Sequence, residues 1–367
     1  MTKQKNRLNS KLIVILGPTA SGKSDLAVEI ALRLSSGQAR KKYGINGAEI
    51  ISADSRQVYH GMNLGTGKVP QDSISPLSDS KHPIAVGQRY FYRGIAHHLL
   101  DIANPKRRFT VAQFKKLALK AIKDIQRRGK IPVICGGTGF YIRVITDNLQ
   151  IPEVKPDLKL RAELEKKTTR ELYDELRKLD PNRAAIIDPY NPRRLIRALE
   201  IILKTGKPVP LLISQNVIPA KAEIQVNESG SRVTRPNTSG GREPGMTQNS
   251  FNTLFLSLKK SPAELKILIR KRLFRRFRQG MVAEVKKLRA SGLSWKRLDG
   301  FGLEYRWITK FLQKKISREE MVTRLQKDIE HYAKRQMTWF KKYPGEKIHW
   351  IKKTKKANKL INNFLAK

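Results

Sequence analysis

An eight-residue glycine-rich segment constrains the fold of this chain more than any other feature. Residues 17–24 read Gly-Pro-Thr-Ala-Ser-Gly-Lys-Ser and match the phosphate-binding pattern G-x-x-x-x-G-K-[ST]. An apolar, β-branched run at 12–16 precedes the segment, and residues 25–32 follow it with helical spacing. A strand, a glycine loop and a helix in this order aim backbone N–H groups and a helix N-terminus at a phosphate chain. The segment therefore predicts a phosphate-binding loop.

Further strand and helix patterns predict the sheet that carries this loop. Residues 48–51 and 131–135 are short, largely apolar runs that we expect to form strands. Between them, Thr110 and Gln113 match a capping box that begins an amphipathic helix, and Gly129 ends it. Strands that alternate with helices at this spacing predict an α/β fold, a P-loop NTPase-like parallel sheet with flanking helices.

Composition and periodicity divide the chain into four expected segments. Residues 11–150 form the first part of the α/β core, 151–211 a charged helical insertion domain, 212–252 a flexible polar insertion, and 253–367 the C-terminal part of the core with basic helices. The core is therefore expected to be assembled from two parts that are far apart in sequence.

The charge of the chain predicts a polyanionic partner. Lys and Arg number 75 against 31 Asp and Glu, a formal net charge of +44, and basic side chains gain affinity for nucleic acid by releasing its counterions. A membrane surface is the competing interpretation. The single cysteine, Cys135, excludes an intrachain disulfide and fits a reducing compartment. No apolar run approaches the roughly 18 residues of a membrane-spanning helix, and the run at 12–16 is too short for a signal peptide. We expect a cytoplasmic protein without a membrane partner.

The acidic residues near the loop distinguish this chain from an ordinary ATPase. Lys23 is expected to hold terminal phosphate oxygens and Ser24 to reach Mg²⁺. An ATP-hydrolysing enzyme places a metal-binding Asp after an apolar strand, but the strand at 131–135 continues into Gly-Gly-Thr-Gly. The carboxylate instead follows the strand at 48–51, as Asp54, at the end of the sheet that faces the same crevice as the phosphate loop. Asp54 either caps the next turn or acts on the nucleophile of a second substrate.

One arginine lies on the apolar side of a predicted helix. The helix begins at Ser261, and at 100° per residue Arg272 falls between Leu265 and Leu268. A charge in that position must pair, reach solvent or face a ligand. A structural ion pair is one interpretation. A phosphate-facing cluster is the other, because further arginines surround it at 270, 275, 276 and 278.

Several other blocks form a specific combination with the phosphate loop. They are Asp54-Ser-Arg-Gln-Val-Tyr59, Gly61-Met-Asn-Leu-Gly-Thr-Gly-Lys68, His97-His-Leu-Leu-Asp101, Gly136-Gly-Thr-Gly139 with Tyr141, Asn191-Pro-Arg-Arg-Leu-Ile-Arg-Ala-Leu-Glu200 and Tyr332-Ala-Lys-Arg-Gln-Met-Thr-Trp-Phe340. With the loop, they resemble the bacterial tRNA dimethylallyltransferases, or tRNA isopentenyltransferases. The resemblance covers Leu12 to about Trp350 except 212–252.

The resemblance implies transfer of a dimethylallyl group from dimethylallyl diphosphate to N6 of the adenosine 3′-adjacent to the anticodon, with release of diphosphate. It implies that the loop binds this donor, through Gly17, Pro18, Thr19, Ala20, Ser21, Gly22, Lys23 and Ser24. The resemblance implies three catalytic residues. Asp54 accepts a proton from the amine, and Thr138 lies near the diphosphate. Arg272 and Mg²⁺ stabilise the leaving group. The target base must leave its stack to reach them.

The partner implied by the resemblance is the anticodon stem-loop of tRNA, bound by a monomer. The tRNA-binding residues expected are Asp54, Ser55, Arg56, Gln57, Arg193, Arg194, Arg197, Lys334 and Arg335. A P-loop small-molecule kinase and a nucleic-acid binder with a vestigial loop remain as alternatives. Neither accounts for all features, because a kinase does not need a charge of +44 and a vestigial loop would not keep Lys23 and Ser24. His97, His98 and Cys135 are expected to be structural.

Overall fold

The computed structural model describes residues 10–73, 90–210, 251–342, 348–352 and 354–367. The expected flexible insertion at 212–252 lies outside the described residues except for its last two positions. The strands are β1 (Lys11–Leu16), β2 (Ala48–Ser52), β3 (Tyr90–Tyr92), β4 (Ile95–His98), β5 (Ile131–Gly136), β6 (Asn252–Leu258) and β7 (Ile348–Ile351).

These seven strands form one sheet in the order β3-β4-β2-β5-β1-β6-β7. Every neighbouring pair is parallel except β3 with β4. β1 lies in the interior, and its last residue, Leu16, pairs with Gly136 of β5 and Ser257 of β6. The segments that follow β1, β5 and β6 therefore leave the sheet at the same edge. The predicted α/β class with a parallel sheet is confirmed.

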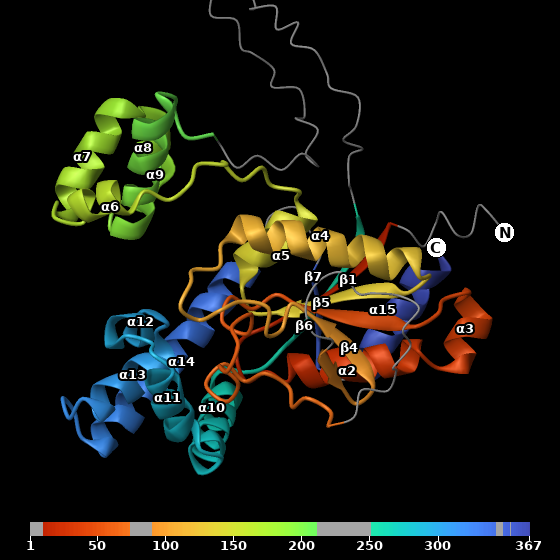
Figure 1. Ribbon diagram of the computed structural model, residues 1–367. Coiled ribbons are helices and arrows are strands. Elements are labelled where there is room, and N and C mark those ends of the chain that lie inside the picture. The colour runs from red at the N-terminus through yellow and green to blue at the C-terminus, as the bar shows by residue number, and fades with distance from the viewer. Residues whose placement is uncertain (1–9, 74–89, 211–250, 343–347, 353) are drawn as a thin grey trace, which may run out of the picture. The chain divides into compact units, whose positions relative to one another are not determined.

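Helices cover both faces of this sheet (Figure 1). Ile13 and Ile15 of β1 pack with apolar side chains of α2, α3 and α15 in one core cluster. Because side chains alternate along a strand, Leu12 and Val14 are buried on the other face, which α4 covers (Figure 1). The bounds are α2 (Lys23–Leu34), α3 (Gly37–Tyr43), α4 (Val111–Arg127) and α15 (Thr354–Ala366). The capping box predicted at Thr110 and Gln113 is present.

A second core joins the C-terminal helices to the segment after β2. Val58, Tyr59 and Met62 are buried with apolar residues of five helices. These are α10 (Pro262–Arg278), α11 (Met281–Ala290), α12 (Trp295–Gly300), α13 (Leu303–Leu312) and α14 (Arg318–Lys341). α10 and α11 are separate helices because Gly280 adopts a φ of 96° between them. Through this core, helices of the C-terminal part of the chain pack beside the segment that follows β2, at the edge of the sheet where the phosphate loop lies.

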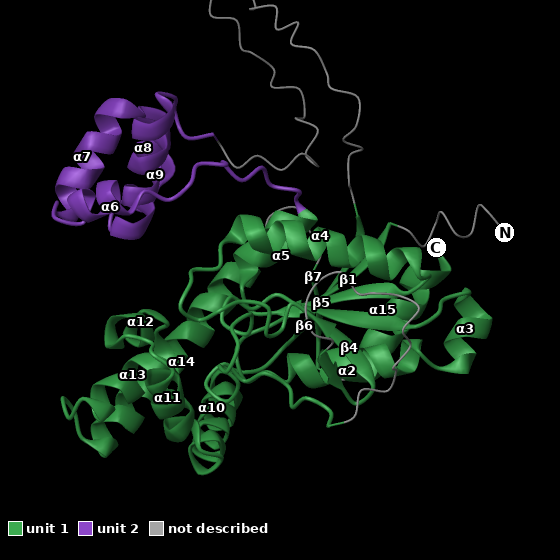
Figure 2. Ribbon diagram, in the orientation of Figure 1, with its two compact units in different colours: residues 1–146, 226–367 green, residues 147–225 purple. Residues whose placement is uncertain are grey.

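Residues 147–225 form a separate compact unit (Figure 2), and the expected helical insertion at 151–211 falls within its bounds. Its described part holds α6 (Leu158–Leu164), α7 (Thr169–Leu179), α8 (Pro181–Ile186) and α9 (Pro192–Thr205). Leu172, Leu176, Leu195 and Leu199 lie in its apolar core. Among the described residues of the whole chain, no helix is both long and apolar enough to cross a membrane.

Candidate active site

The phosphate loop follows β1 and ends where α2 begins. Gly22, the residue before α2, adopts a φ of 88°, a conformation that L side chains rarely adopt. Ala20 adopts a φ of 64°, so the loop holds a non-glycine residue in a strained conformation. Lys23 is partly buried, and its ammonium donates a hydrogen bond to the Pro18 carbonyl at 3.4 Å. Burial lowers the pKa of Lys23, because desolvation disfavours the charged ammonium.

Arg272 reaches the same loop from α10. Its guanidinium donates a hydrogen bond to the Thr19 hydroxyl. Burial, followed by repulsion from Arg276, lowers the pKa of Arg272 to about 9. No carboxylate of a described residue lies within ion-pair distance of it. Of the two interpretations left open for Arg272, the structural ion pair is absent from the described part of the chain, and the contact with the phosphate loop is present.

The arginines around Arg272 do not form one phosphate-facing cluster. Arg276 forms a buried ion pair with Glu304 at 3.2 Å. Its guanidinium also packs against Gly67, where an added Cβ would lie 1.7 Å from Nη2. Arg270 lies over the Phe274 ring, and the remaining two arginines, at 275 and 278, are exposed. Sequence reasoning missed the partner, Glu304, for which the local signal was a carboxylate in a largely apolar helix.

Asp54 combines a structural contact with an available oxygen. Its Oδ1 accepts hydrogen bonds from the backbone N–H groups of Arg56 at 2.8 Å and Gln57 at 3.4 Å, which is the turn-capping role foreseen as one alternative. Its Oδ2 makes no hydrogen bond with another described residue. The cap fixes the carboxylate and leaves one oxygen able to accept a proton from a substrate, so the two roles are compatible.

Thr138 links the loop after β5 to the Asp54 turn. Its N–H donates to the Ala53 carbonyl at 3.2 Å, and its hydroxyl accepts from the Ser55 N–H at 3.2 Å. An added Cβ at Gly136 would lie 2.2 Å from the Ala53 carbonyl oxygen. Glycine at that position permits the close approach of the two strands' ends.

Gln57 is committed to contacts within the protein. Its amide oxygen accepts from the Ser52 hydroxyl at 2.9 Å, and its amide nitrogen donates to the carbonyls of Thr66 and Gly67 at 3.3 and 3.2 Å. The Arg56 guanidinium lies 5.6 Å from the centre of the Phe301 ring. Gln57 therefore holds the 66–67 backbone, and both Arg56 and Gln57 stay partly exposed.

Glu284 fixes the segment that follows, a role that the sequence did not reveal. Its carboxylate accepts hydrogen bonds from three successive backbone N–H groups, at residues 63, 64 and 65, at 2.9, 2.6 and 3.1 Å. It also accepts from the Tyr305 hydroxyl at 2.8 Å. Lys68, at the end of the same segment, forms an ion pair with Asp101. The blocks at 61–68 and 97–101 that stood out in the sequence thus meet in one network.

The residues expected to bind RNA differ in exposure. Arg193 and Arg194 on α9 and Lys334 and Arg335 on α14 are exposed. Arg197, by contrast, forms an ion pair with the buried Glu200 at 2.5 Å and donates to the Val154 carbonyl at 2.9 Å. The contacts of Arg197 support a structural role within its own unit.

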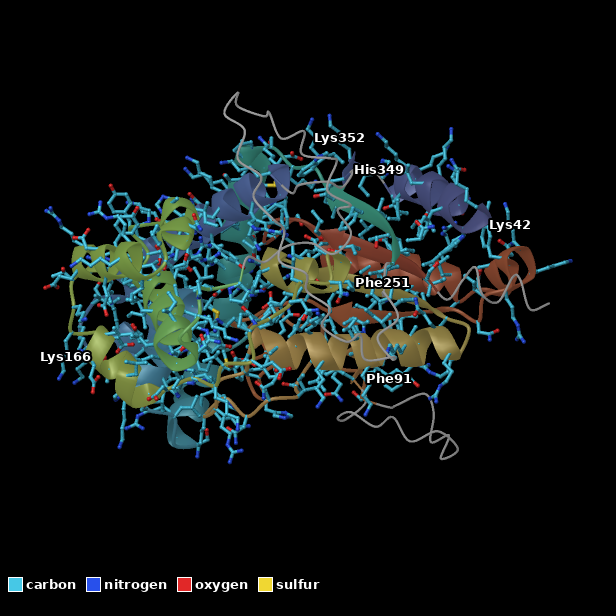
Figure 3. The ribbon with its side chains drawn as sticks, turned by 90° about the horizontal axis from the view of Figure 1, so that it is seen from above. Lys42, Phe91, Lys166, Phe251, His349 and Lys352 are labelled. Atoms are coloured by element: carbon cyan, nitrogen blue, oxygen red, sulfur yellow. The ribbon has the colours of Figure 1, made fainter. Side chains whose placement is uncertain are left out.

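A large cavity adjoins the basic face of α14. It has a volume of about 1200 Å³ and lies between the start of α10, α14 and the end of β7. Five of its lysines are Lys259, Lys260, Lys334, Lys341 and Lys352, the last of which Figure 3 labels. Because Lys334 is one of them, an expected RNA-contacting residue forms part of the cavity wall.

Few side chains of the site could coordinate a metal ion. No three His, Cys, Asp or Glu side chains of described residues are grouped as metal ligands. Ser24, at the start of α2, borders a cavity of about 20 Å³, enough for one water molecule. One hydroxyl completed by phosphate oxygens and water fits Mg²⁺, which keeps several waters and binds oxygen ligands.

The histidines and the cysteine have structural contacts. His98 Nε2 lies 2.8 Å from a Glu49 carboxylate oxygen, and His97 Nδ1 lies 3.0 Å from the Ile95 carbonyl oxygen. Burial lowers the pKa of His97 to about 4. Burial raises the pKa of the Cys135 thiol to about 11, so a reactive thiolate is not favoured there.

Comparison with known proteins bears on this arrangement. The family model described as IPP transferase matches residues 57–343. The chain is 35% identical over 359 residues to a tRNA dimethylallyltransferase of Acetivibrio thermocellus, covering 96% of each chain. It is 34% identical over 342 residues to tRNA dimethylallyltransferase 2 of Pelobacter propionicus, covering 93% of this chain and 89% of the relative.

Solved structures give a similar result. A tRNA isopentenylpyrophosphate transferase of Bacillus halodurans is 28% identical, with a TM-score of 0.59 and 97% of each chain covered. A eukaryotic dimethylallyltransferase acting on tRNA is 25% identical, with a TM-score of 0.60, and the match covers 90% of this chain and 70% of that one.

Proposed function

Because the chain belongs to the IPP transferase family, we propose that it acts as a tRNA dimethylallyltransferase. It transfers a dimethylallyl group from dimethylallyl diphosphate to N6 of the adenosine 3′-adjacent to the anticodon and releases diphosphate. The observation that carries the proposal is the meeting of two partly buried cations at the phosphate loop, Lys23 and Arg272, with the Asp54 carboxylate close by. The relatives favour this activity over that of a small-molecule kinase.

The cations are suited to the donor. Lys23 and Arg272 are bonded to neutral oxygens of the loop, those of Pro18 and Thr19. A bound diphosphate would supply the negative charge that both lack. As the allylic carbon–oxygen bond breaks, charge grows on the departing diphosphate, and the same two cations stabilise it. Arg272 and Thr138 remain our proposed catalytic residues beside Asp54.

The acceptor side requires a base. The amine at N6 attacks the allylic carbon, a carbon–nitrogen bond forms, and one proton must leave the nitrogen. Asp54 Oδ2 is free to accept that proton, while Oδ1 stays bonded to the turn. The adenine must be extruded from its stack to reach this carboxylate.

Mg²⁺ is the metal that we propose for this reaction. Ser24 would hold it together with diphosphate oxygens, and the ion would add positive charge where the leaving group develops its negative charge. Ser24 and Lys23 are neighbours at the start of α2, so a bound donor would meet both. The remaining residues of the loop, 17–22, surround the same position.

tRNA is the polyanion that the charge of +44 predicts. Ser55, Arg56, Arg193, Arg194, Lys334 and Arg335 remain our proposed RNA contacts, and all keep some exposed surface. Many other basic side chains, such as Lys42 on α3, point outward (Figure 3). We also propose that the protein is a monomer. We place it in the cytoplasm, because tRNA is modified there.

The direct test is a transfer assay with two donors. The protein is incubated with labelled dimethylallyl diphosphate and unmodified tRNA, and in parallel with labelled ATP. Label that reaches tRNA only from the prenyl donor supports the proposal. Calorimetry completes the test, because tight binding of ATP with no binding of the prenyl diphosphate would refute it and favour a kinase.

A further inference from the structure

Gln336, on the buried side of α14, connects two loops of the site. Its side chain is 6% exposed. Its amide oxygen accepts a hydrogen bond from the Thr19 N–H at 2.8 Å, and its amide nitrogen donates to the Gly137 carbonyl at 2.8 Å. The two partners lie 317 and 199 residues away in sequence. One side chain from the C-terminal helix therefore holds both the loop after β1 and the loop after β5.

The amide group is suited to this position and few other side chains are. The bond at Thr19 needs an acceptor, and the bond at Gly137 needs a donor. An uncharged amide offers one of each at its two ends. A carboxylate would meet the Gly137 carbonyl with a second acceptor, and an apolar side chain would leave a buried N–H and a buried carbonyl without partners, which is costly.

On the side of the phosphate loop, Gln336 acts where the backbone is strained. Its bond is made at Thr19, next to Ala20, which has a φ of 64°. Thr19 is held a second time, through its hydroxyl, by Arg272. A strained residue persists only where its surroundings fix it. The Thr19 N–H is also already used, so it is not one of the loop amides that would bind the diphosphate.

On the other side, α14 fits closely over the loop after β5. An added Cβ at Gly137 would lie 2.3 Å from Gln336 Nε2, and one at Gly139 would lie 2.4 Å from the Trp339 ring. Gln336 and Trp339 are three residues apart and share one face of the helix. Between the two glycines stands Thr138, which is bonded to the Asp54 turn through Ala53 and Ser55.

We infer that Gln336 is a positioning residue that sets the spacing between the donor loop and the Asp54–Thr138 side of the site. The inference rests on the proposed function. Both polar ends of the Gln336 side chain are bonded to the protein backbone. It aligns the donor carbon with the attacking amine by fixing both loops to one helix, and a displacement of about 1 Å in such an alignment costs on the order of 10²-fold in rate.

The test compares Gln336→Met with a matched buried glutamine. Gln126 is 8% exposed, and its amide donates to the Lys11 carbonyl at the opposite end of β1, at 3.2 Å. Both substitutions to Met remove a buried amide and keep the length of the side chain. The measurements are single-turnover transfer with both substrates saturating, KM for dimethylallyl diphosphate, tRNA affinity and melting temperature.

We expect Gln336→Met to slow single-turnover transfer by about 10- to 100-fold, with tRNA affinity within twofold of the unmodified protein. Gln126→Met should lower the melting temperature through the loss of its bond to Lys11 and keep the transfer rate within twofold. If Gln336→Met is no slower than Gln126→Met, the inference is wrong. If Gln336→Met does not fold, Gln336→Glu decides, because it keeps the bond from Thr19 and loses only the one to Gly137. A normal rate in that variant would overturn the inference.

Failure of the proposed function gives a different result. In that case the unmodified protein transfers no label to tRNA, and the inference falls with the function. Equal transfer by the unmodified protein and Gln336→Met would refute the inference alone.

Discussion

Replacing Asp54 separates its two roles, because Asn and Ala remove different parts of the side chain. Asn keeps an oxygen that can accept from the backbone N–H groups of Arg56 and Gln57 and removes the basic carboxylate. Ala removes both. A general base contributes typically 10²- to 10⁴-fold, about 3–5 kcal/mol of barrier. A lost turn cap costs about 1–2 kcal/mol of stability.

Asp54→Asn should therefore reduce kcat by about 100-fold or more with an unchanged melting temperature. Asp54→Ala should reduce kcat at least as much and also lower the melting temperature, by about 2–4 °C for each kcal/mol lost. Transfer of labelled dimethylallyl groups to tRNA measures kcat, and fluorescence anisotropy with labelled tRNA measures binding, which we expect to persist in both variants.

A control comes from Asp72, whose Oδ1 accepts from the Arg93 N–H and whose Oδ2 accepts from the Gly94 N–H, both at 2.9 Å. Asp72→Asn makes the same chemical change outside the site. Because it loses one of these two bonds, it should lower the melting temperature and keep full activity. The assignment of Asp54 as base would be refuted by Asp54→Asn turning over within threefold of the unmodified protein. Loss of tRNA binding in that variant would instead indicate a role in recognition.

Three further changes test other parts of the site and the fold. Arg272→Met should raise KM for dimethylallyl diphosphate by about 10- to 100-fold, the value of a charge-assisted hydrogen bond of roughly 1.5–3 kcal/mol, whereas Arg275→Met, on the exposed side of α10, should not. Lys334→Ala should weaken tRNA binding and reduce the slope of log K against log salt by about 1, measured by a salt titration of binding. Burial alone would raise the pKa of Glu49, but hydrogen bonds from Arg128 and His98 outweigh it and hold that pKa well below its usual range. The stability that Glu49 contributes is therefore present above its unfolded pKa of about 4.3 and is lost as the pH falls below that value. Glu49→Gln should lower the free energy of unfolding by about 3–5 kcal/mol at pH 7. Denaturant titrations at pH 3 should find a smaller difference between the variant and the unmodified protein.

Local signals in the sequence predicted the elements that carry the phosphate loop. The run at 12–16, the glycine loop and the helix after it are neighbours in the chain, and each has its own pattern. The capping box at Thr110 and the helix start at Ser261 are also local, and both are present. Arg272 stood out because a charge on an apolar helix face is a local anomaly, and it does contact the loop.

Contacts between distant segments could not be read in this way. Strands β3, β4 and β7 have three or four residues each, too short to show a period. Glu284 and Gln336 carry no local mark, because their backbone partners lie about two hundred residues or more away. Arg276 and Arg272 are one helical turn apart and look alike in sequence. Only the position of Glu304 on another helix separates the paired arginine from the unpaired one.

The cations at the phosphate loop differ in their partners from two other partly buried cations of this protein. Lys68 and Arg128 each form an ion pair with a carboxylate. Lys23 and Arg272 at the loop are bonded to neutral oxygens. Withdrawing a cation from water without a counterion has a free-energy cost. A diphosphate would relieve it at both residues together. Lys23 and Arg272 therefore stabilise the charged diphosphate, which is the leaving group, and have no comparable interaction with the uncharged prenyl part of the donor.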